Sequence, residues 1–206
     1  MGRDHDMNSQ DTGLQAHAKR VNAADYPILG VLALGPAHGY DVWRYIRDRL
    51  GGVWNLGRSQ VYALLVQLER DALVYHERVE QTNLPSRKVY YLKDEGRVAF
   101  DAWISQPVQH VRDCRLEFPS KLHFAQKRSA GTASSLIQDQ VAVCLRKRQQ
   151  MEAARDRSTV EIQRQVLEYR LAVIDATIGW LKGLVVSKNA ENPLCEDESS
   201  ASSPSS

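Results

Sequence analysis

One predicted helix, from about Arg58 to Asp71, carries side chains that can form hydrogen bonds on a single face. Projection of this segment at about 100° per residue separates an apolar side from a side with small, aromatic and polar residues. The apolar side holds Val61, Leu64, Leu65 and Leu68, and the other holds Ser59, Tyr62, Ala63, Val66, Gln67 and Arg70. A solvated face usually carries more Glu and Lys, so this pattern favours close contact with the floor of a DNA groove.

The chemistry expected of this face is hydrogen bonding to phosphates and to base edges. Main-chain amides near its amino end can hold a phosphate, because the first N–H groups of a helix have no partner within it. Ser59 and Gln60 can donate to phosphate or base edges, while Ala63 and Val66 suit a thymine methyl group. Each contact has a structural alternative, in which Tyr62 is a half-buried packing residue and Arg70 a solvated charge. The predicted contacts on this helix are Arg58, Ser59, Gln60, Tyr62, Ala63, Val66 and Arg70.

Two further helices are expected before this one. The first runs from the possible N-cap Asp25 to Leu34 and is stopped by Gly35-Pro36. The second begins near Gly39-Tyr40 and is ended by Gly51-Gly52. Its predicted buried side is Trp43, Ile46 and Leu50. His38 is expected to cap or stabilise the turn before the second helix.

A β-hairpin is expected after Leu73. Val74–Glu80 and Arg87–Leu92 are rich in Val and Tyr, and the turn-forming segment Gln81–Ser86 separates them. Arg87 and Lys88 are adjacent in a strand, so their side chains point to opposite faces and only one reaches a phosphate directly. The other is expected to pair with Glu77 or Glu80. A fourth helix starts at Asp94-Glu95 and ends before Pro107.

The remainder of the chain, residues 110–186, is predicted to be helical. Helical pieces are expected near 112–126, 134–157 and 160–186, and the last has the clearest pattern. Apolar residues recur there every seven positions in two linked series, which is typical of helices that pair, and we predict pairing across a dimer. The predicted dimerisation residues are Val160, Leu167, Leu171, Ile174, Ile178, Leu181 and Val185.

Charge and composition limit the classes of function. The 206 residues carry a net charge of +2, with 43% hydrophobic and 25% charged residues. Residues 28–104 hold ten Lys/Arg against nine Asp/Glu, whereas residues 105–186 hold thirteen against eight. Binding of DNA must therefore depend on a few placed cations rather than on general basicity.

Neither a metal site nor a catalytic site is expected. The three cysteines, Cys114, Cys144 and Cys195, are widely spaced and include no CxxC motif, so reduced thiols are the default. His110 and Cys114 are spaced i, i+4, but no third metal ligand is convincingly placed. We expect no enzyme activity, no cofactor, no membrane span and no signal peptide, and a cytoplasmic location.

Five short motifs follow one another between about Tyr26 and Pro107. They are His38-Gly39-Tyr40, Gln60-Val61-Tyr62-Ala63-Leu64-Leu65, Leu68-Glu69-Arg70-Asp71-Ala72-Leu73-Val74, Arg87-Lys88-Val89-Tyr90 and Gly96-Arg97-Val98-Ala99. Through these motifs the segment resembles the PadR family of bacterial transcriptional regulators. The C-terminal half, through Glu117–Leu122 followed by His123–Ala125, is similar to the helical domain of the longer, virulence-activator-like branch of this family.

The resemblance implies a mainly α (α+β) fold, with an N-terminal winged helix-turn-helix bearing a two-stranded wing, followed by an all-helical dimerisation domain. It implies a homodimer on double-stranded DNA, with Tyr40, Tyr62, Arg87 and Lys88 among the contacts. It also implies a possible small aromatic effector near Trp103, although core packing is the simpler role for that residue. The family motifs often have Ser where this chain has Gly57, Pro at Ala63, Gly at Ala72 and Arg at Leu84.

We therefore expect four regions: a flexible arm (1–22), a winged-helix DNA-binding domain (23–107), a helical dimerisation domain (108–186) and a disordered tail (187–206). The expected function is a homodimeric regulator, more often a repressor, that binds an inverted-repeat operator through helix 58–71 and wing 74–92. The alternative is a winged helix that binds other proteins without contacting DNA.

Overall fold

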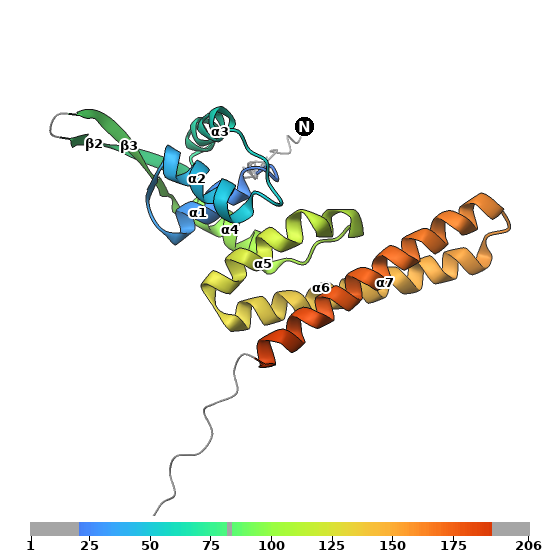
Figure 1. Cartoon of the computed structure of the whole chain (residues 1–206). Coiled ribbons are helices and arrows are strands. Elements are labelled where there is room, and N and C mark those ends of the chain that lie inside the picture. The colour runs from blue at the N-terminus through green and yellow to red at the C-terminus, as the bar shows by residue number, and fades with distance from the viewer. Residues whose placement is uncertain (1–20, 82–83, 191–206) are drawn as a thin grey trace, which may run out of the picture.

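The structure is a computed structural model, which describes the backbone of residues 21–81 and 84–190 and the side chains of residues 21–79 and 87–184. A winged-helix part with a projecting hairpin lies at one end, and a long pair of antiparallel helices extends from the other (Figure 1). The elements are α1 (Tyr26–Leu34), β1 (Ala37–His38), α2 (Gly39–Leu50), α3 (Arg58–Arg70), β2 (Val74–Gln81), β3 (Leu84–Leu92), α4 (Asp94–Ser105), η1 (Val111–Arg115), α5 (Glu117–Arg128), α6 (Ala130–Arg157) and α7 (Glu161–Ala190).

The three helices of the winged-helix part pack around one apolar core. In α3 the predicted inner side is confirmed, since Val61, Leu65 and Leu68 are buried and Leu64 is partly buried. In α2 the buried residues are Val42, Ile46 and Leu50, so the prediction for Trp43 was one position out. Trp43 is only partly buried and stacks under the Arg47 guanidinium, which covers its outer face.

The wing belongs to a three-stranded antiparallel sheet in the order β1-β3-β2, not to a two-stranded hairpin alone. The additional strand β1 is only two residues long, which is too short for a period-2 pattern to reveal. The turn is also shorter than Gln81–Ser86, because β2 continues to Gln81 and β3 begins at Leu84. The side chain of Leu84 at this tip lies outside the described residues.

The carboxyl end of α3 explains one departure from the family pattern. Ala72 has φ of 57°, and the Leu73 amide bonds back to the Leu68 carbonyl at 2.9 Å. This is a Schellman-type helix end, whose left-handed position favours glycine because a Cβ is strained there.

We expect Ala72→Gly to raise the free energy of unfolding by about 0.5–1 kcal/mol, since relief of the left-handed strain exceeds the entropy gained by the unfolded chain. Urea denaturation of the purified protein measures this change. The matched control is Ala102→Gly, in the interior of α4, where the same exchange should cost about 1 kcal/mol. Destabilisation by both exchanges would contradict the strain argument.

Helix α5 belongs to both halves of the molecule. Its Phe124 completes the core of the winged-helix part, while Phe118, Leu122 and Ala125 lie in a second core with α6 and α7. A Cβ at Gly30 of α1 would clash with the Phe124 ring, so a larger residue there would displace the ring or separate α1 from α5. The expected domain boundary at residue 107 therefore does not separate two independently packed cores, because α5 contributes side chains to both.

Helix α7 carries two heptad stripes, and the structure corrects the role of the first. Of the predicted dimerisation residues, Leu171, Ile174, Ile178 and Leu181 are buried in the second core of this same chain. Pairing of this stripe with other helices was expected, but the helices that cover it are α5 and α6 rather than a partner's. Leu167 is partly buried, Val160 precedes the helix and is 46% exposed, and the side chain of Val185 lies outside the described residues.

The ends of the chain are only partly described. Val21 packs on the first core and the Asn22 amide donates to Asp25, so the expected arm gives way to ordered chain by residue 21. Helix α7 continues to Ala190, which shortens the expected tail at its start. Residues 1–20 and 191–206 lie outside the described residues. Within the described ranges, none of the helices combines the length and apolar character that a membrane crossing requires.

Candidate nucleic-acid interface

A groove between α2, α3 and the wing strand β3 brings together residues from three separate sequence motifs. Its volume is about 760 Å³. Five of the ten residues predicted to bind DNA line it: Tyr40, Tyr62, Val66, Arg87 and Lys88. The remaining lining residues are His38, Gly39, Asp41, Arg44 and Tyr90.

The start of α2 positions the tyrosine of α3. A Cβ on Gly39 would lie 2.7 Å from the Tyr62 ring, so the glycine allows that ring to approach the start of α2 closely. Tyr62 remains 42% exposed and Tyr40 44% exposed, so both side chains are accessible from solvent. This arrangement suits a hydrogen bond from each hydroxyl to a phosphate.

His38 fixes the wing relative to the helices. Its backbone pairs with Val89 of β3, and its Nδ1 lies 3.0 Å from the Lys88 carbonyl oxygen, to which it donates in the tautomer protonated at Nδ1. His38 was expected to cap α2 or to stabilise the turn before it, but its side chain makes no capping hydrogen bond and contacts β3 instead. Sequence reasoning missed His38 and Arg44 as groove residues, because neither belongs to α3 or to the wing.

The wing cations do not pair with Glu77, and the side chain of Glu80, the other expected partner, lies outside the described residues. Arg87 lies opposite Val79, and Lys88 lies opposite Arg78, so neither faces an acid across the hairpin. Glu77 instead hydrogen-bonds to Tyr91, and burial together with Glu77 raises the pKa of that phenol. Among the described side chains, neither Arg87 nor Lys88 forms an ion pair, which leaves both cations available to a polyanion.

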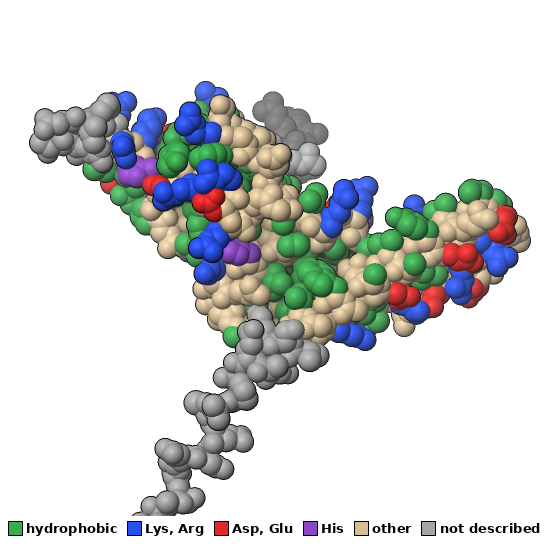
Figure 2. All heavy atoms as spheres, in the orientation of Figure 1, with side chains coloured by type: hydrophobic (Ala, Val, Ile, Leu, Met, Phe, Trp, Pro, Cys, Tyr) green, Lys and Arg blue, Asp and Glu red, His purple; other side chains and the backbone are tan. Residues whose placement is uncertain are grey.

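The remaining predicted contacts lie on the exposed surface of α3 outside the groove: Arg58, Ser59, Gln60, Ala63 and Arg70. Gly57 precedes α3 in extended conformation and provides no side-chain cap. The first amides of α3 thus keep the free N–H groups on which the predicted phosphate contact depends. Lys and Arg side chains are gathered over this part of the molecule in Figure 2, although its overall charge is nearly balanced.

Trp103 is placed in the core rather than in a cavity. Its ring stacks on Tyr26 with centroids 4.6 Å apart, and its Nε1 donates to Glu117 at 3.0 Å. The Lys121 ammonium lies over the same ring, 5.3 Å from its centroid, and donates to the Gln106 carbonyl at 2.7 Å. Trp103 is therefore a core-packing residue, which is the simpler of the two roles considered for it.

A polar seam joins the winged-helix part to α5. Trp54 Nε1 donates to the Ser120 hydroxyl at 2.6 Å, and the Tyr45 hydroxyl lies 2.8 Å from Nε2 of His123. Burial lowers the pKa of His123, and the nearby charges of Lys127 and Arg49 lower it further. The seam thus holds His123 in its neutral form at neutral pH.

We expect the stability of the protein to fall as the pH drops through this histidine's range. The folded pKa lies below the unfolded value of about 6.5, so full stability is present above that value and is lost as the pH falls through it toward the folded pKa. His123→Gln should reduce this loss between about pH 7.5 and pH 5.5 by about 0.5–1 kcal/mol, after allowance for partial exposure.

Urea denaturation at a series of pH values measures this effect. Tyr45→Phe is the control, because it removes the hydrogen bond to His123 but leaves His123 buried. Burial is the largest cause of the lowered pKa of His123, so this variant should retain most of the pH dependence. An unchanged pH profile for His123→Gln would contradict the assignment.

Comparison with known proteins gives matches to transcriptional regulators. Residues 28–102 match the model of the "Transcriptional regulator PadR-like family". Over 119 residues the chain is 34% identical to the negative transcriptional regulator PadR of Bacillus subtilis, which covers 56% of this chain and 64% of that protein. Over 93 residues it is 30% identical to a probable transcriptional regulator of Mycobacterium tuberculosis, covering 45% of this chain and 49% of the relative. The chain thus spans less than two thirds of the length of either relative.

Solved structures give matches over longer stretches. Bacillus subtilis PadR in complex with operator DNA is 26% identical, with 82% of this chain and 98% of that chain covered and a TM-score of 0.40. The same protein in complex with p-coumaric acid is 25% identical, with 81% and 96% covered and a TM-score of 0.35.

Proposed function

We propose that the chain, whose residues 28–102 match the PadR-like family of transcriptional regulators, is a member of that family that binds double-stranded DNA as a homodimer and represses transcription. The observation that supports this most is the groove in which Tyr40, Tyr62, Val66, Arg87 and Lys88 come together from three sequence motifs. The family is one of regulators rather than enzymes.

In the proposed complex, α3 enters the major groove and the wing follows the adjacent backbone. The amino end of α3 holds a phosphate, its exposed face reads base edges, and Arg87 or Lys88 adds a charge-assisted contact. Two copies related by a two-fold axis would place two such helices on an inverted repeat, with half-sites about one helical turn apart or a multiple of it. The name of the Bacillus subtilis relative, a negative regulator, favours repression.

The second stripe of α7 is the surface that we assign to the partner subunit. Ile162, Val166, Tyr169, Val173 and Trp180 are between 40% and 70% exposed and recur with heptad spacing, two residues out of step with the buried stripe. Two residues turn a helix by about 200°, so this stripe lies on a different side of α7 from the buried one. Its Tyr169, Val173 and Trp180 border a cavity between η1, α6 and α7. Of the flanking positions Gln163, Gln165, Arg170, Ala172, Thr177 and Gly179, Arg170 alone is charged, so little charge repulsion opposes the approach of two copies there. A heptad stripe of this kind is self-complementary, as a two-fold interface requires.

A small aromatic effector is a further part of the proposal, and it rests on the resemblance to Bacillus subtilis PadR, which has been crystallised with p-coumaric acid. Trp103 does not support it, because its ring is buried between Tyr26 and Lys121.

The direct test is binding of the full chain to the DNA upstream of its own gene, measured by fluorescence anisotropy over a series of salt concentrations. We expect the logarithm of the binding constant to fall linearly with the logarithm of the salt concentration. The slope should steepen by about 0.9 for each phosphate contact. A folded dimer without salt-sensitive binding to any duplex would overturn the proposal and favour the protein-interaction module.

A further inference from the structure

Two cysteines lie against each other in the second core. Cys114 belongs to η1 and is 4% exposed, and Cys144 belongs to the middle of α6 and is 1% exposed. Both sulfurs lie within reach of the same Gln140 side-chain nitrogen, which places them close to each other. The 29 residues between them give no sequence sign of this contact, which is made by the packing of η1 on α6.

A buried glutamine connects this pair to the chain between the two halves of the protein. The side-chain nitrogen of Gln140 lies 3.5 Å from Sγ of Cys114 and 3.8 Å from Sγ of Cys144. The same side chain accepts a hydrogen bond from the Val108 amide at 2.6 Å and donates one to the Val108 carbonyl at 2.9 Å. We refer to these two bonds as the Gln140 clamp. It fixes the start of the connection from α4 to η1.

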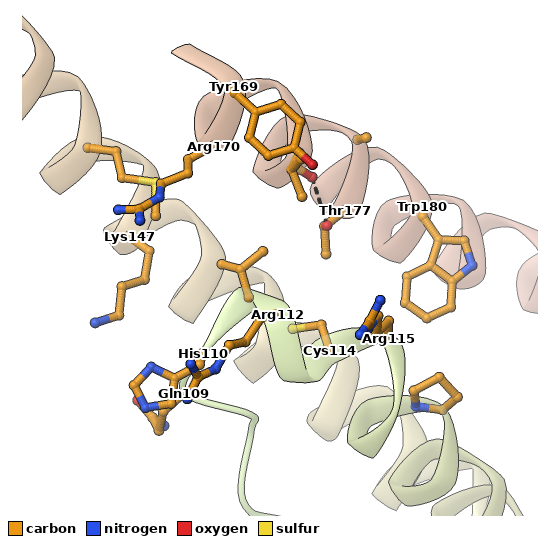
Figure 3. Close-up of a pocket in the computed structure, with 15 residues that line it drawn as sticks. Gln109, His110, Arg112, Cys114, Arg115, Lys147, Tyr169, Arg170, Thr177 and Trp180 are labelled. Carbon is orange, nitrogen blue, oxygen red and sulfur yellow. Dashed lines mark hydrogen bonds between the residues drawn. The ribbon is translucent and has the colours of Figure 1, made fainter. Parts of the chain in front are cut away.

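The pair lies beside a cavity of about 1110 Å³ between η1, α6 and α7, which Cys114 lines and Cys144 does not. Figure 3 shows Cys114 on η1 between Arg112 and Arg115, across from Tyr169 and Trp180 of α7. These two aromatic residues also belong to the stripe of α7 that we assign to the partner subunit. Cys114 is therefore the sulfur that a reagent in this cavity meets first.

The surroundings favour loss of one proton from the pair. Contact with Cys114 lowers the pKa of Cys144 to about 7 against the opposing effect of burial, and the Gln140 amide lowers it further. The same contact and burial raise the pKa of Cys114, so the first proton leaves the pair from the side of Cys144. Because the two sulfurs are in contact, the remaining proton can lie on either sulfur. A thiolate is the form that attacks oxidants.

We propose that Cys114 and Cys144 are a redox-active pair, which a hydroperoxide converts into an intrachain disulfide that opens the Gln140 clamp. In the first step the Cys114 thiolate attacks the O–O bond, takes one oxygen as a sulfenic acid, and an alcohol leaves after gaining a proton. In the second step the Cys144 sulfur attacks the sulfenic sulfur, the S–S bond forms, and water leaves with the Cys144 proton. The two thiols are oxidised by two electrons and the hydroperoxide is reduced by two.

Opening of the clamp follows from the change in sulfur positions. Bonding brings the two sulfurs to about 2.05 Å from each other, so both move from the places where the Gln140 amide now meets them. That amide is fully buried, and loss of partners for a buried polar group is costly. We therefore expect Gln140 to reorient and the Val108 segment to loosen. This inference does not depend on the proposed DNA binding.

The test uses the full chain treated with cumene hydroperoxide, followed by alkylation of free thiols and peptide mass spectrometry without reduction. We expect a peptide pair joined through Cys114 and Cys144, which is lost after reduction. Amide hydrogen exchange should be faster at Val108 in the oxidised protein than in the reduced protein. Cys195→Ser is the matched control, because it removes the third cysteine and should leave both results unchanged, whereas Cys144→Ala should abolish both.

Three results would overturn the proposal: sulfinic acid at Cys114 without a linked peptide, a linkage through Cys195 or between two chains, or a Cys114–Cys144 linkage without faster exchange at Val108. The reduced Cys144→Ala protein must give the reduced wild-type exchange pattern elsewhere, which separates a redox effect from a packing defect.

Discussion

Tyr62→Ala combined with Arg87→Ala is expected to weaken DNA binding by about 100- to 1000-fold. Each substitution removes one phosphate contact per subunit, so a dimer loses four, and each such contact contributes on the order of 1 kcal/mol. Tyr62 is 42% exposed and Arg87 is exposed on the wing, so the fold should survive both changes.

Fluorescence anisotropy with the upstream DNA at several salt concentrations measures this effect and its origin. The loss of the Arg87 contact from both subunits should reduce the salt slope by about 1.8, whereas the loss of the uncharged Tyr62 should change affinity more than slope. Arg87→Ala and Lys88→Ala, made separately, decide which face of β3 reaches the phosphate. The matched control, Arg146→Ala, removes one exposed arginine of α6 outside the groove and should bind like the wild type. Unchanged binding by the Tyr62/Arg87 variant would refute this assignment of the interface.

The local patterns in the chain were sufficient to predict the elements that form this groove. The face of α3 follows from the positions of Val61, Leu65 and Leu68, because a helix of known period has only one way to bury all three. The path of the wing follows from its Val and Tyr content. The contribution of His38 could not be predicted in this way, since its partner is the Lys88 carbonyl, 50 residues further along the chain.

The C-terminal half shows a second limit of sequence patterns. A heptad stripe indicates that a helix pairs, but it does not say whether the partner helix belongs to the same chain. Here Ile174 and Leu181 are buried by the chain's own helices. The second stripe could also be recognised in the sequence, since it has the same period and an offset of two residues. Two stripes on one helix indicate that α7 has two apolar sides, one for its own chain and one that we assign to the partner subunit.

The contact of α5 with both halves is a third case. Its sequence has apolar residues on several sides, and the burial of the charged Lys121 among them would be improbable for an isolated surface helix. Lys121 is paired with Glu117 and covers the ring of Trp103, so its charge is compensated where two cores meet. This arrangement depends on the tertiary structure and has no local sequence signal.

Val173→Glu is expected to convert the dimer into a folded monomer, with the dimer dissociation constant raised by about 100-fold or more. Val173 lies in the middle of the exposed stripe of α7, so a two-fold interface would bury two carboxylates without partners, each at a cost of several kcal/mol. The monomer should also lose most of its affinity for an inverted repeat, since it can place only one α3.

Ile174, the residue next to Val173, provides the control. The two residues are neighbours in the same helix turn, but Val173 belongs to the exposed stripe and Ile174 to the buried one. Ile174 is fully buried against α5 and α6, and Ile174→Ala should lower the free energy of unfolding by about 3 kcal/mol through the cavity it leaves. Sedimentation velocity gives the association state, and urea denaturation of each variant gives its stability. If the exposed stripe forms the interface, Val173→Glu changes association at nearly constant stability of the subunit, whereas Ile174→Ala changes stability first. If Val173→Glu remained a dimer, the interface would have to lie on another surface. The exposed stripe of α7 would then not have its proposed role.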